Sequence, residues 1–354
     1  MKKIKSIINE IFIEGLSGMA TGLFATLIVG TIIQQIGGFI PGAIGDYLFF
    51  TGKVAAAATG AGIGVGTALR LKSSPLVIVS AAVSGMAGAF ASKIIGGTFL
   101  VEGVVNLAGP GEPLGAFIAA IITIYLGRLV SGRTKVDILI TPLACIISGS
   151  AIGLVFGPPI SAFMTFLGGL INAGTQQAPF LMGIIVSVLM GMILTLPISS
   201  AALGVILNLS GLAAGAATVG CCANMVGFAV ASYRENKVNG LLAQGLGTSM
   251  LQIGNIVKKP VIWLPAIITS AVLGPVSTLL FGMTNNATGS GMGTAGLVGQ
   301  ITTYQTMVSE TSPAVVLIKI ILLHFIFPAA ISLGISEFMR KKQWIKQGDM
   351  KLEV

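Results

Sequence analysis

Long apolar runs, each about as long as a bilayer is thick, recur along this chain and leave little room for charge. Residues 261–281 and 314–338 form two of these runs. Of the 354 residues, 54% are hydrophobic and only 9% are charged, whereas a soluble protein carries about 25% charged residues. A membrane-spanning helix needs about 20 predominantly apolar residues. The sequence therefore predicts an all-α polytopic membrane protein with about ten transmembrane helices.

The predicted spans follow one another with short connections. In chain order they cover residues 16–36, 48–69, 75–95, 114–129, 138–156, 160–171, 179–196, 201–231, 261–281 and 314–338. Pro158-Pro159 is expected to separate the fifth span from the sixth, because proline interrupts helical hydrogen bonding. The first run lacks a small-residue cleavage site, so we expect a retained span rather than a signal peptide.

Two polar segments between the spans are predicted to be re-entrant hairpins. Residues 241–257 contain three side-chain amides and end at Lys258-Lys259. A full crossing would place these lysines outside, against the positive-inside rule, whereas a hairpin keeps them inside. The same reasoning makes residues 284–303 the second re-entrant element.

The net charge of +9 would suggest a nucleic-acid partner in a soluble domain. Here the cations lie in short loops and at the chain ends, where the positive-inside rule accounts for them. We therefore expect no nucleic acid, and both termini in the cytoplasm. Residues 1–15 are predicted to form an interfacial segment, 16–338 one transmembrane domain, and 339–354 a basic cytoplasmic tail that faces lipid headgroups.

The most polar stretch inside the apolar sequence is residues 282–300, Gly-Met-Thr-Asn-Asn-Ala-Thr-Gly-Ser-Gly-Met-Gly-Thr-Ala-Gly-Leu-Val-Gly-Gln. Such a stretch is costly in hydrocarbon unless it lines a cavity. A second polar break covers residues 172–179. The candidate substrate-binding side chains in the two breaks are Asn285, Asn286, Thr288, Asn172, Thr175, Gln176 and Gln177. Amides donate and accept hydrogen bonds, which suits the hydroxyl pairs of a sugar or polyol; loop amides facing water are the alternative interpretation.

Two ionisable residues are weaker candidates for the same site. Glu112 lies in a Gly-Pro-Gly-Glu-Pro turn at the start of a span and either contacts sugar hydroxyls or is a solvated loop acid. His324 lies within the last predicted span, where an ionisable side chain indicates function by default. A neutral histidine bonded to a neighbouring helix is the alternative. Pairing of His324 or Lys319 with a carboxylate would indicate ion coupling.

Two glycine patterns have structural interpretations. The alternating run Gly60-x-Gly62-x-Gly64-x-Gly66 predicts close helix packing. Residues 291–296, Gly-x-Gly-x-x-Gly, formally match a dinucleotide-binding fingerprint, but that motif requires a strand and a helix around it. Because membrane spans flank this one, we expect its glycines to form a tight turn instead.

No catalytic or metal-binding constellation is visible. The chain has one histidine and three cysteines, and the cysteines all lie inside apolar runs. Neither a metal-ligand spacing nor a nucleophile with its base can be assembled from these residues, so the sequence predicts no cofactor.

Three short motifs carry a resemblance to a known family. They are Asn-Ala-Gly-Thr-Gln-Gln-Ala-Pro (172–179), Leu-Pro-Ile-Ser-Ser-Ala-Ala-Leu (196–203) and Gly-Met-Thr-Asn-Asn-Ala-Thr-Gly-Ser-Gly-Met-Gly (282–293). With the ten spans and the polar hairpin, they resemble the membrane-embedded IIC components of the bacterial sugar phosphotransferase system. The resemblance is strongest to a IIC-like branch that includes proteins named as regulators of toxin expression, and it covers nearly the whole chain.

The resemblance implies a homodimeric permease in the bacterial inner membrane. Each subunit would hold a sugar between a scaffold and a mobile transport domain, and a separate IIB protein, charged by IIA, would phosphorylate the sugar. Glucose-type members carry a glutamate in a Gly-x-x-Glu-Pro hairpin, and this chain departs from that pattern. Its hairpin has Asn285-Asn286, and its only Gly-x-x-Glu-Pro is residues 109–113. A membrane regulator that kept the fold, and a secondary transporter independent of phosphotransfer, therefore stay open as alternatives.

Overall fold

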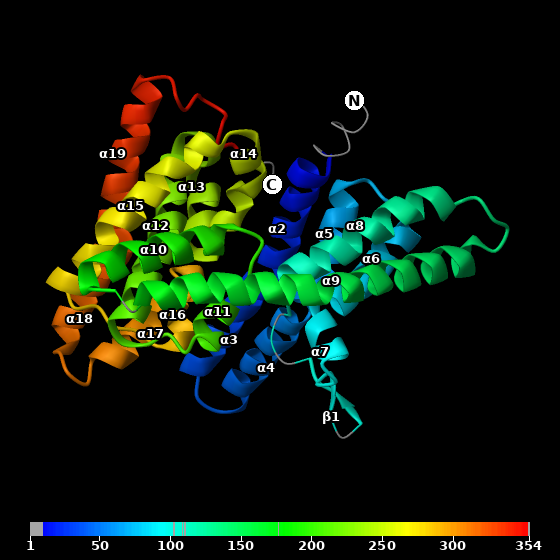
Figure 1. Cartoon of the computed structure of the whole chain (residues 1–354), viewed down its shortest axis with the longest axis horizontal. Coiled ribbons are helices and arrows are strands. Elements are labelled where there is room, and N and C mark those ends of the chain that lie inside the picture. Colours follow the sequence, from blue (N-terminus) through cyan, green and yellow to red (C-terminus); the bar gives the residue numbers. More distant parts are fainter. Residues whose placement is uncertain (1–9, 102, 108, 110, 176, 353–354) are drawn as a thin grey trace. The chain divides into compact units, whose positions relative to one another are not determined.

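The chain folds almost entirely into helices (Figure 1). The computed structural model describes residues 10–352 except 102, 108, 110 and 176. Helices dominate because a helix satisfies its own backbone hydrogen bonds where no water is present. Within the described residues, the one sheet is an antiparallel pair of two-residue strands, β1 (Leu100–Val101) and β2 (Val104–Val105). Apart from this ladder, the predicted all-α class is confirmed.

Six of the described helices are long and apolar enough to cross a membrane, which confirms a polytopic membrane protein. These candidate spans are Glu10–Phe39 (η1, α2, η2 and α3), Pro113–Val130 (α8), Asp137–Thr175 (α9), Gly211–Ala231 (α12), Pro260–Leu280 (η5, α15 and η6) and Pro313–Lys341 (α18, η8 and α19). Helices α4 (Ala43–Ala57) and α5 (Thr59–Arg70) would add a seventh if their pair, bent by 55°, counts as one span. The apolar helices α6 (Pro75–Ala89) and α10 (Pro179–Thr195) are shorter.

The expected break at Pro158-Pro159 is absent, because helix α9 continues through both residues. A proline inside a helix removes one hydrogen bond and crowds the preceding turn. Helical residues on both sides continue the helix here despite that loss, so the predicted fifth and sixth spans form one 39-residue helix.

The predicted span 201–231 is instead divided in two. Helix α11 (Ser200–Ile206) ends before a turn in which Asn208 has φ 47° and Gly211 has φ 58°. Asparagine and glycine are the residues that most readily adopt this left-handed conformation. The local turn chemistry therefore interrupts an otherwise apolar run.

The helices group into two compact units, Met1–Phe163 and Met164–Val354. In the first unit, α5 packs between α2 (Leu16–Leu23) and α6 through its alternating glycines. An ideal Cβ on Gly62 would lie 2.8 Å from the Gly22 carbonyl oxygen of α2, and one on Gly60 would lie 2.8 Å from the Gly85 carbonyl oxygen of α6. Both contacts are too short for a side chain. The predicted packing role of this glycine run is thus confirmed.

Ion pairs join the N-terminal turns of the first unit to its basic helix ends. Arg70, the last residue of α5, donates to Glu14 at 2.8 Å, and Arg128 near the end of α8 donates to Glu10 at 2.6 Å. The beginning of the described chain and both basic helix ends therefore lie at one end of this unit.

Helix α12 is the central helix of the second unit, where it packs against α10, α15 (Leu264–Pro275) and α19 (Phe327–Lys341). Its residues are mostly small, and nearly all are buried. Gly220 lies directly against the backbone of Ser187 in α10, and Gly215 lies against the backbone of Met283. Small residues permit such close backbone contact, and they let α12 contact many neighbours at once.

Residues 241–257 form short helical pieces that begin and end at the same end of the second unit. Near the start, Glu235 of α13 (Tyr233–Leu242) pairs with Arg340 at 2.9 Å, and both side chains are buried. Near the finish, just after α14 (Ile253–Lys258), Lys259 pairs with Asp349 at 2.6 Å. Both pairs involve the C-terminal part of the chain, so this segment returns to the end from which it starts.

The C-terminal segment, residues 342–352, packs onto these pieces through side-chain amides. The carbonyl oxygen of Met350 accepts hydrogen bonds from Asn236 Nδ2 at 2.8 Å and Gln252 Nε2 at 2.9 Å. Asn236 Oδ1 in turn accepts from the backbone N–H of Leu352 at 2.8 Å. Ile345 and Met350 are fully buried in an apolar cluster with Trp263. The segment is thus an integral part of the second unit.

We expect Asp349→Asn to weaken the attachment of this segment at neutral pH, by up to about 1 kcal/mol for a partly exposed ion pair. Burial raises the pKa of Asp349, but the hydrogen bonds from Lys259 and from the Lys346 amide outweigh burial, so its pKa lies below the usual value. A carboxylate with a lowered pKa stabilises the fold fully above its unfolded pKa of about 3.9. That stabilisation is lost as the pH falls through the folded pKa.

Hydrogen exchange of residues 345–352, measured against pH, checks this expectation. Protection should be lower in Asp349→Asn than in the wild type at neutral pH, and the difference should start to shrink below about pH 4 and close as the pH falls through the lowered pKa of Asp349. Glu310→Gln, the same change at an exposed acid, is the control and should show no difference. A gap between wild type and Asp349→Asn that persists in acid would contradict the ion-pair explanation.

Candidate functional site

The polar hairpin, residues 282–300, folds as a compact turn between two membrane-spanning segments. After η6 (Val276–Leu280) it forms α16 (Ala287–Ser290) and η7 (Ala295–Leu297), and it enters α17 (Val298–Met307). Gly282, Gly293 and Gly296 have φ values of 56°, 53° and 54°, a region that other residues rarely adopt. The glycines therefore make the turn possible, as expected.

The dinucleotide interpretation has no structural support in the described residues around the hairpin. An ideal Cβ on Gly291 would collide with the backbone of Ser200 in α11, and one on Gly293 would lie 2.8 Å from Cys221 Cβ in α12. These glycines permit close packing of the hairpin onto neighbouring helices. The strand–turn–helix unit that a dinucleotide fingerprint requires is not formed there.

Asn285 fastens the hairpin to α12. Its Nδ2 donates to Thr218 Oγ1 at 2.8 Å and to the Gly299 carbonyl oxygen at 3.2 Å, while its Oδ1 accepts from the Asn286 backbone N–H at 2.8 Å. The side chain is 1% exposed. Because Gly299 lies near the hairpin's other end, Asn285 also closes the hairpin on itself.

Asn286 and Thr288 are more accessible than Asn285. Asn286 caps α16 by accepting a hydrogen bond from the Gly289 backbone N–H at 3.0 Å, and it is half-buried. Thr288 is exposed. Of the three predicted hairpin contacts, these two are the ones that an approaching molecule can reach.

The last residue of the hairpin, Gln300, connects it to His324 in η8 (Ile321–Ile326). Gln300 Nε2 lies 3.0 Å from His324 Nδ1 and 3.4 Å from Cys222 Sγ. An amide nitrogen can only donate, so Nδ1 acts as the acceptor and the proton of the neutral ring is assigned to Nε2. His324 is fully buried. At Nδ1, His324 is therefore the neutral histidine bonded to a neighbouring helix that the sequence offered as the alternative to a functional histidine.

Three buried polar atoms in this neighbourhood have no hydrogen-bond partner among the described residues. They are Gln300 Oε1, Thr303 Oγ1 and His324 Nε2. Gln300 and Thr303 lie one helical turn apart on α17, and so on one face. Buried polar groups are almost always paired. These three atoms therefore keep hydrogen-bonding capacity that the described residues do not use.

The second polar break, residues 172–179, is connected to the segment that precedes the hairpin. Thr278 Oγ1 in η6 donates to the Pro179 carbonyl oxygen at 2.9 Å. Gln177 is exposed and donates to the Ala173 carbonyl oxygen at 3.3 Å, while Thr175, the last residue of α9, is half-buried. Gln176 and the side chain of Asn172 lie outside the described part of the chain.

Glu112 belongs to the first unit, whereas the other described candidates belong to the second. It precedes α8, and its backbone N–H donates to the Ala89 carbonyl oxygen at 2.8 Å. The residue as a whole is half-buried, and its Oε1 atom is fully buried.

Lys319 and His324 do not pair with carboxylates among the described residues. Lys319 Nζ donates to the Phe281 carbonyl oxygen at 2.6 Å, directly after η6. A cation there interacts favourably with the negative end of the helix dipole. His324 pairs with an amide. The carboxylate pairing that would have indicated ion coupling is therefore not observed.

Sequence reasoning missed several polar residues that organise this region. Asn224 in α12 accepts hydrogen bonds from Trp263 Nε1 at 2.8 Å and Thr195 Oγ1 at 3.2 Å, and it donates to Ser270 Oγ at 3.1 Å. Ser200 Oγ donates to the Gly291 carbonyl oxygen at 2.6 Å. In the sequence, Asn224 stands out as a lone amide within a run of small, mostly apolar residues, which indicates a buried hydrogen-bonding role. Gln300 was visible as the final polar residue of the hairpin.

Comparison with known families agrees with this architecture. The family model described as "Phosphotransferase system, EIIC" matches residues 13–352, from the first span to the C-terminal segment. The chain belongs to the phosphotransferase-system EIIC family. Membership makes it a multi-pass membrane protein of that system, and it implies interaction with other components of the system. Among curated proteins and among solved structures, no match is found.

The EIIC-family chain forms no metal centre within its described residues. No group of three or more histidine, cysteine, aspartate or glutamate side chains converges there. Cys145, Cys221 and Cys222 are buried free thiols. The polar side chains that bond the hairpin to its neighbours are amides, hydroxyls, thiols and one imidazole.

We expect Asn285→Ala to destabilise the protein, because it removes three hydrogen bonds and leaves the Asn286 N–H without its acceptor. Thr218 still donates to the Ala214 carbonyl oxygen, and the Gly299 carbonyl oxygen still accepts from Thr302. Each buried group left unsatisfied costs about 1–3 kcal/mol. The melting temperature in detergent micelles should therefore fall clearly. Thr288→Ala, a change at an exposed residue of the same hairpin, should alter stability by no more than about 0.5 kcal/mol. Equal melting temperatures for the two variants would refute the fastening role of Asn285.

Proposed function

We propose that this protein is the membrane permease component of a sugar phosphotransferase system. It would carry a neutral hydroxylated solute, a sugar or a polyol, across the bilayer for phosphorylation by a separate IIB protein that IIA has charged. The observation that carries the proposal is the EIIC-family match over residues 13–352. The chain itself would contribute binding and translocation, and the phosphoryl group would come from IIB.

The open polar atoms around His324 support a neutral, hydroxylated substrate. A sugar hydroxyl can accept a hydrogen bond from His324 Nε2–H and donate one to Gln300 Oε1, and Thr303 can do either. None of these groups needs a charge to bind. Asn286 and Thr288 would contact the substrate from the hairpin, and Asn285 would hold the hairpin in place.

The other predicted contacts are also part of this proposal. Gln177 and Thr175 lie in the second polar break, which Thr278 connects to the segment before the hairpin. We include Gln176, Asn172 and Glu112 from the sequence pattern alone. They are proposed as further contacts along the substrate path.

The proposed topology has about ten crossings, two re-entrant hairpins and both termini in the cytoplasm of a bacterial cell. Two groupings of charged residues support the cytoplasmic placement of the termini. Arg70 and Arg128 lie beside Glu14 and Glu10 in the first unit, and the basic residues near 234, 259 and 340 gather with the C-terminal segment in the second. Clustered cations of this kind favour the cytoplasmic side. We also propose a homodimer, on the family resemblance.

A membrane regulator or sensor that retained the permease fold is the second candidate. The observation that favours it is the composition of the polar hairpin, which contains two asparagines and no carboxylate where glucose-type relatives carry a glutamate. Such a protein would bind its ligand without moving it.

Reconstitution separates the two candidates. We expect proteoliposomes of the purified protein to accumulate sugar phosphate from at least one labelled sugar only when phosphorylated IIB is present inside. Empty liposomes and unphosphorylated IIB are the controls. Failure to take up any of a broad panel of labelled sugars, together with altered gene expression on deletion, would overturn the permease and support the regulator.

Within the site, we expect Asn286→Ala to weaken sugar binding about tenfold, the equivalent of one hydrogen bond of about 1.4 kcal/mol. The protein should stay folded, since Asn286 is only half-buried. Equilibrium binding in detergent measures the affinity, and Gln347→Ala, at an exposed amide of the C-terminal segment, is the matched control. An unchanged affinity for Asn286→Ala would remove that residue from the site.

A further inference from the structure

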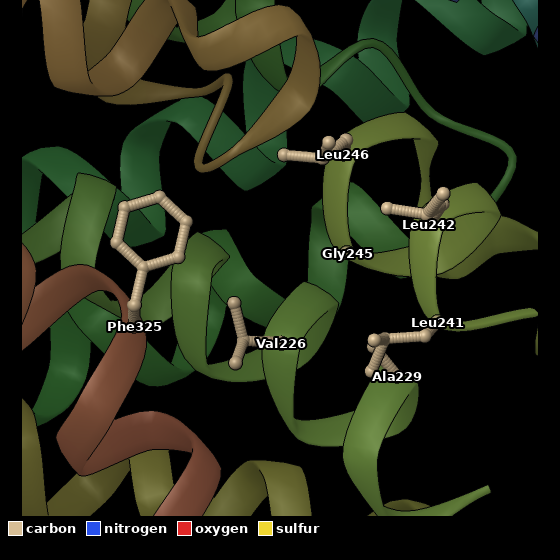
Figure 2. A pocket seen from close by; sticks show the side chains of 7 residues that line it. All are labelled: Val226, Ala229, Leu241, Leu242, Gly245, Leu246 and Phe325. Carbon is tan, nitrogen blue, oxygen red and sulfur yellow. The ribbon is translucent and has the colours of Figure 1, made fainter. Parts of the chain in front are cut away.

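The second unit contains an apolar cavity of about 250 Å³ that the proposed sugar site does not use. Val226 and Ala229 of α12 form one wall, and Phe325 of η8 forms another. Leu241 of α13 and Leu246 of η3 (Ala243–Gly247) also line it. Figure 2 shows Phe325 on one side of this space and the leucines on the other.

The lining of this apolar cavity excludes a sugar. Val226, Ala229, Leu242 and Phe325 offer carbon surface only, and Gly245 adds no side chain. A hydroxyl placed there would lose its hydrogen bonds to water without replacement. A flexible hydrocarbon chain would instead gain from burial. The cavity adjoins membrane-spanning helices, where such chains are the solvent.

A second cavity, of about 550 Å³, adjoins the first at Leu241 and has a polar rim. Leu333 and Val230 continue the apolar lining, but Tyr233, Arg234 and Glu337 also contribute. Arg234 donates to Glu337 at 2.8 Å. The two cavities together therefore pass from a wholly apolar end to a polar, charged end.

The polar end is lined by one cation, Arg234, and one acid, Glu337, and two further lysines follow Glu337 in the chain. The Arg234 side chain is 61% exposed, and its guanidinium offers five N–H donors, more than the pair with Glu337 needs. Lys341 follows Glu337 by one helical turn on α19 and is exposed, as is Lys342. An anionic group with several oxygens, such as a phosphodiester, matches this arrangement.

We propose that these joined cavities bind one anionic phospholipid. An acyl chain would occupy the apolar cavity between Val226 and Phe325, and the phosphate of the headgroup would lie against Arg234. The site is distinct from the polar hairpin, and it does not depend on whether the protein transports a sugar. Each cavity volume is of the order expected for part of a ligand site of about 300–1,000 Å³.

Photolabelling of the full-length protein in nanodiscs tests the site. The nanodiscs contain phosphatidylcholine with a minor fraction of phosphatidylglycerol that carries a photoreactive acyl chain. We expect labelled peptides to concentrate around Val226, Leu246 and Phe325. An excess of unlabelled phosphatidylglycerol should reduce this labelling several-fold, and an equal excess of phosphatidylcholine should not.

Gly245→Leu fills the apolar cavity without forcing the backbone. An ideal Cβ on Gly245 meets only Ala229 Cβ, at an ordinary 3.5 Å. We expect labelling around Phe325 to fall several-fold in this variant. Gly169→Leu is the matched control, because nothing lies within 4 Å of its Cβ position and the residue is exposed on α9; it should label as the wild type does.

Arg234→Gln tests the charged end. The preference for phosphatidylglycerol over phosphatidylcholine with the same photoreactive chain should disappear, while Lys258→Gln, at an exposed lysine elsewhere in the unit, should retain it. Even labelling of all lipid-facing helices in the wild type would overturn the proposal, and so would undiminished labelling in folded Gly245→Leu. Absence of lipid label around Val226 and Phe325, together with disulfide-linked dimers formed by a Val226→Cys variant, would replace the lipid with a subunit interface.

Discussion

Broken helices inside a membrane must find partners for their backbone groups within the protein, and the second unit is built around that requirement. The polar hairpin lies between two spanning segments, and its backbone groups need partners within the protein wherever water is absent. Asn285 supplies the missing partners by bonding Thr218, the Gly299 carbonyl and the Asn286 N–H. Because Asn285 is buried and fixed by these bonds, the neighbouring Asn286 and Thr288 are held at an accessible surface.

Close packing against α12 makes those bonds possible. The hairpin and helices α10, α15 and α19 all contact this helix, and glycines such as Gly215 and Gly220 bring neighbouring backbones directly against it. Larger residues would move these neighbours outward and separate Asn285 from Thr218. A helix of small residues thus supports all the elements that build the site. The apolar cavity beside Val226 lies between this helix and its neighbours α13, η3 and η8.

Much of this fold follows from sequence, because hydrophobicity and glycine spacing act locally. The apolar runs predicted a helical polytopic protein, and the alternating glycines of α5 predicted its close contacts. The pairing of Gln300 with His324 could not be predicted, since it joins separate elements 24 residues apart and depends on their packing. Asn285 and Asn286 are identical neighbours in sequence, yet one is buried and bonded to α12 while the other caps a helix. Likewise, Pro158-Pro159 suggested a break that the surrounding helix overrides.

The attachment of the C-terminal segment has a consequence for the order of assembly during synthesis. Asn236 and the Met350 carbonyl oxygen that it bonds are 114 residues apart in the chain, and Lys259 reaches Asp349 over 90 residues. Contacts so distant in sequence form late. Asn236, Gln252 and Asn255 therefore obtain their partners in residues 350–351 only after every later membrane helix has been made. Quality control that senses unburied polar surface would have its longest opportunity on this segment.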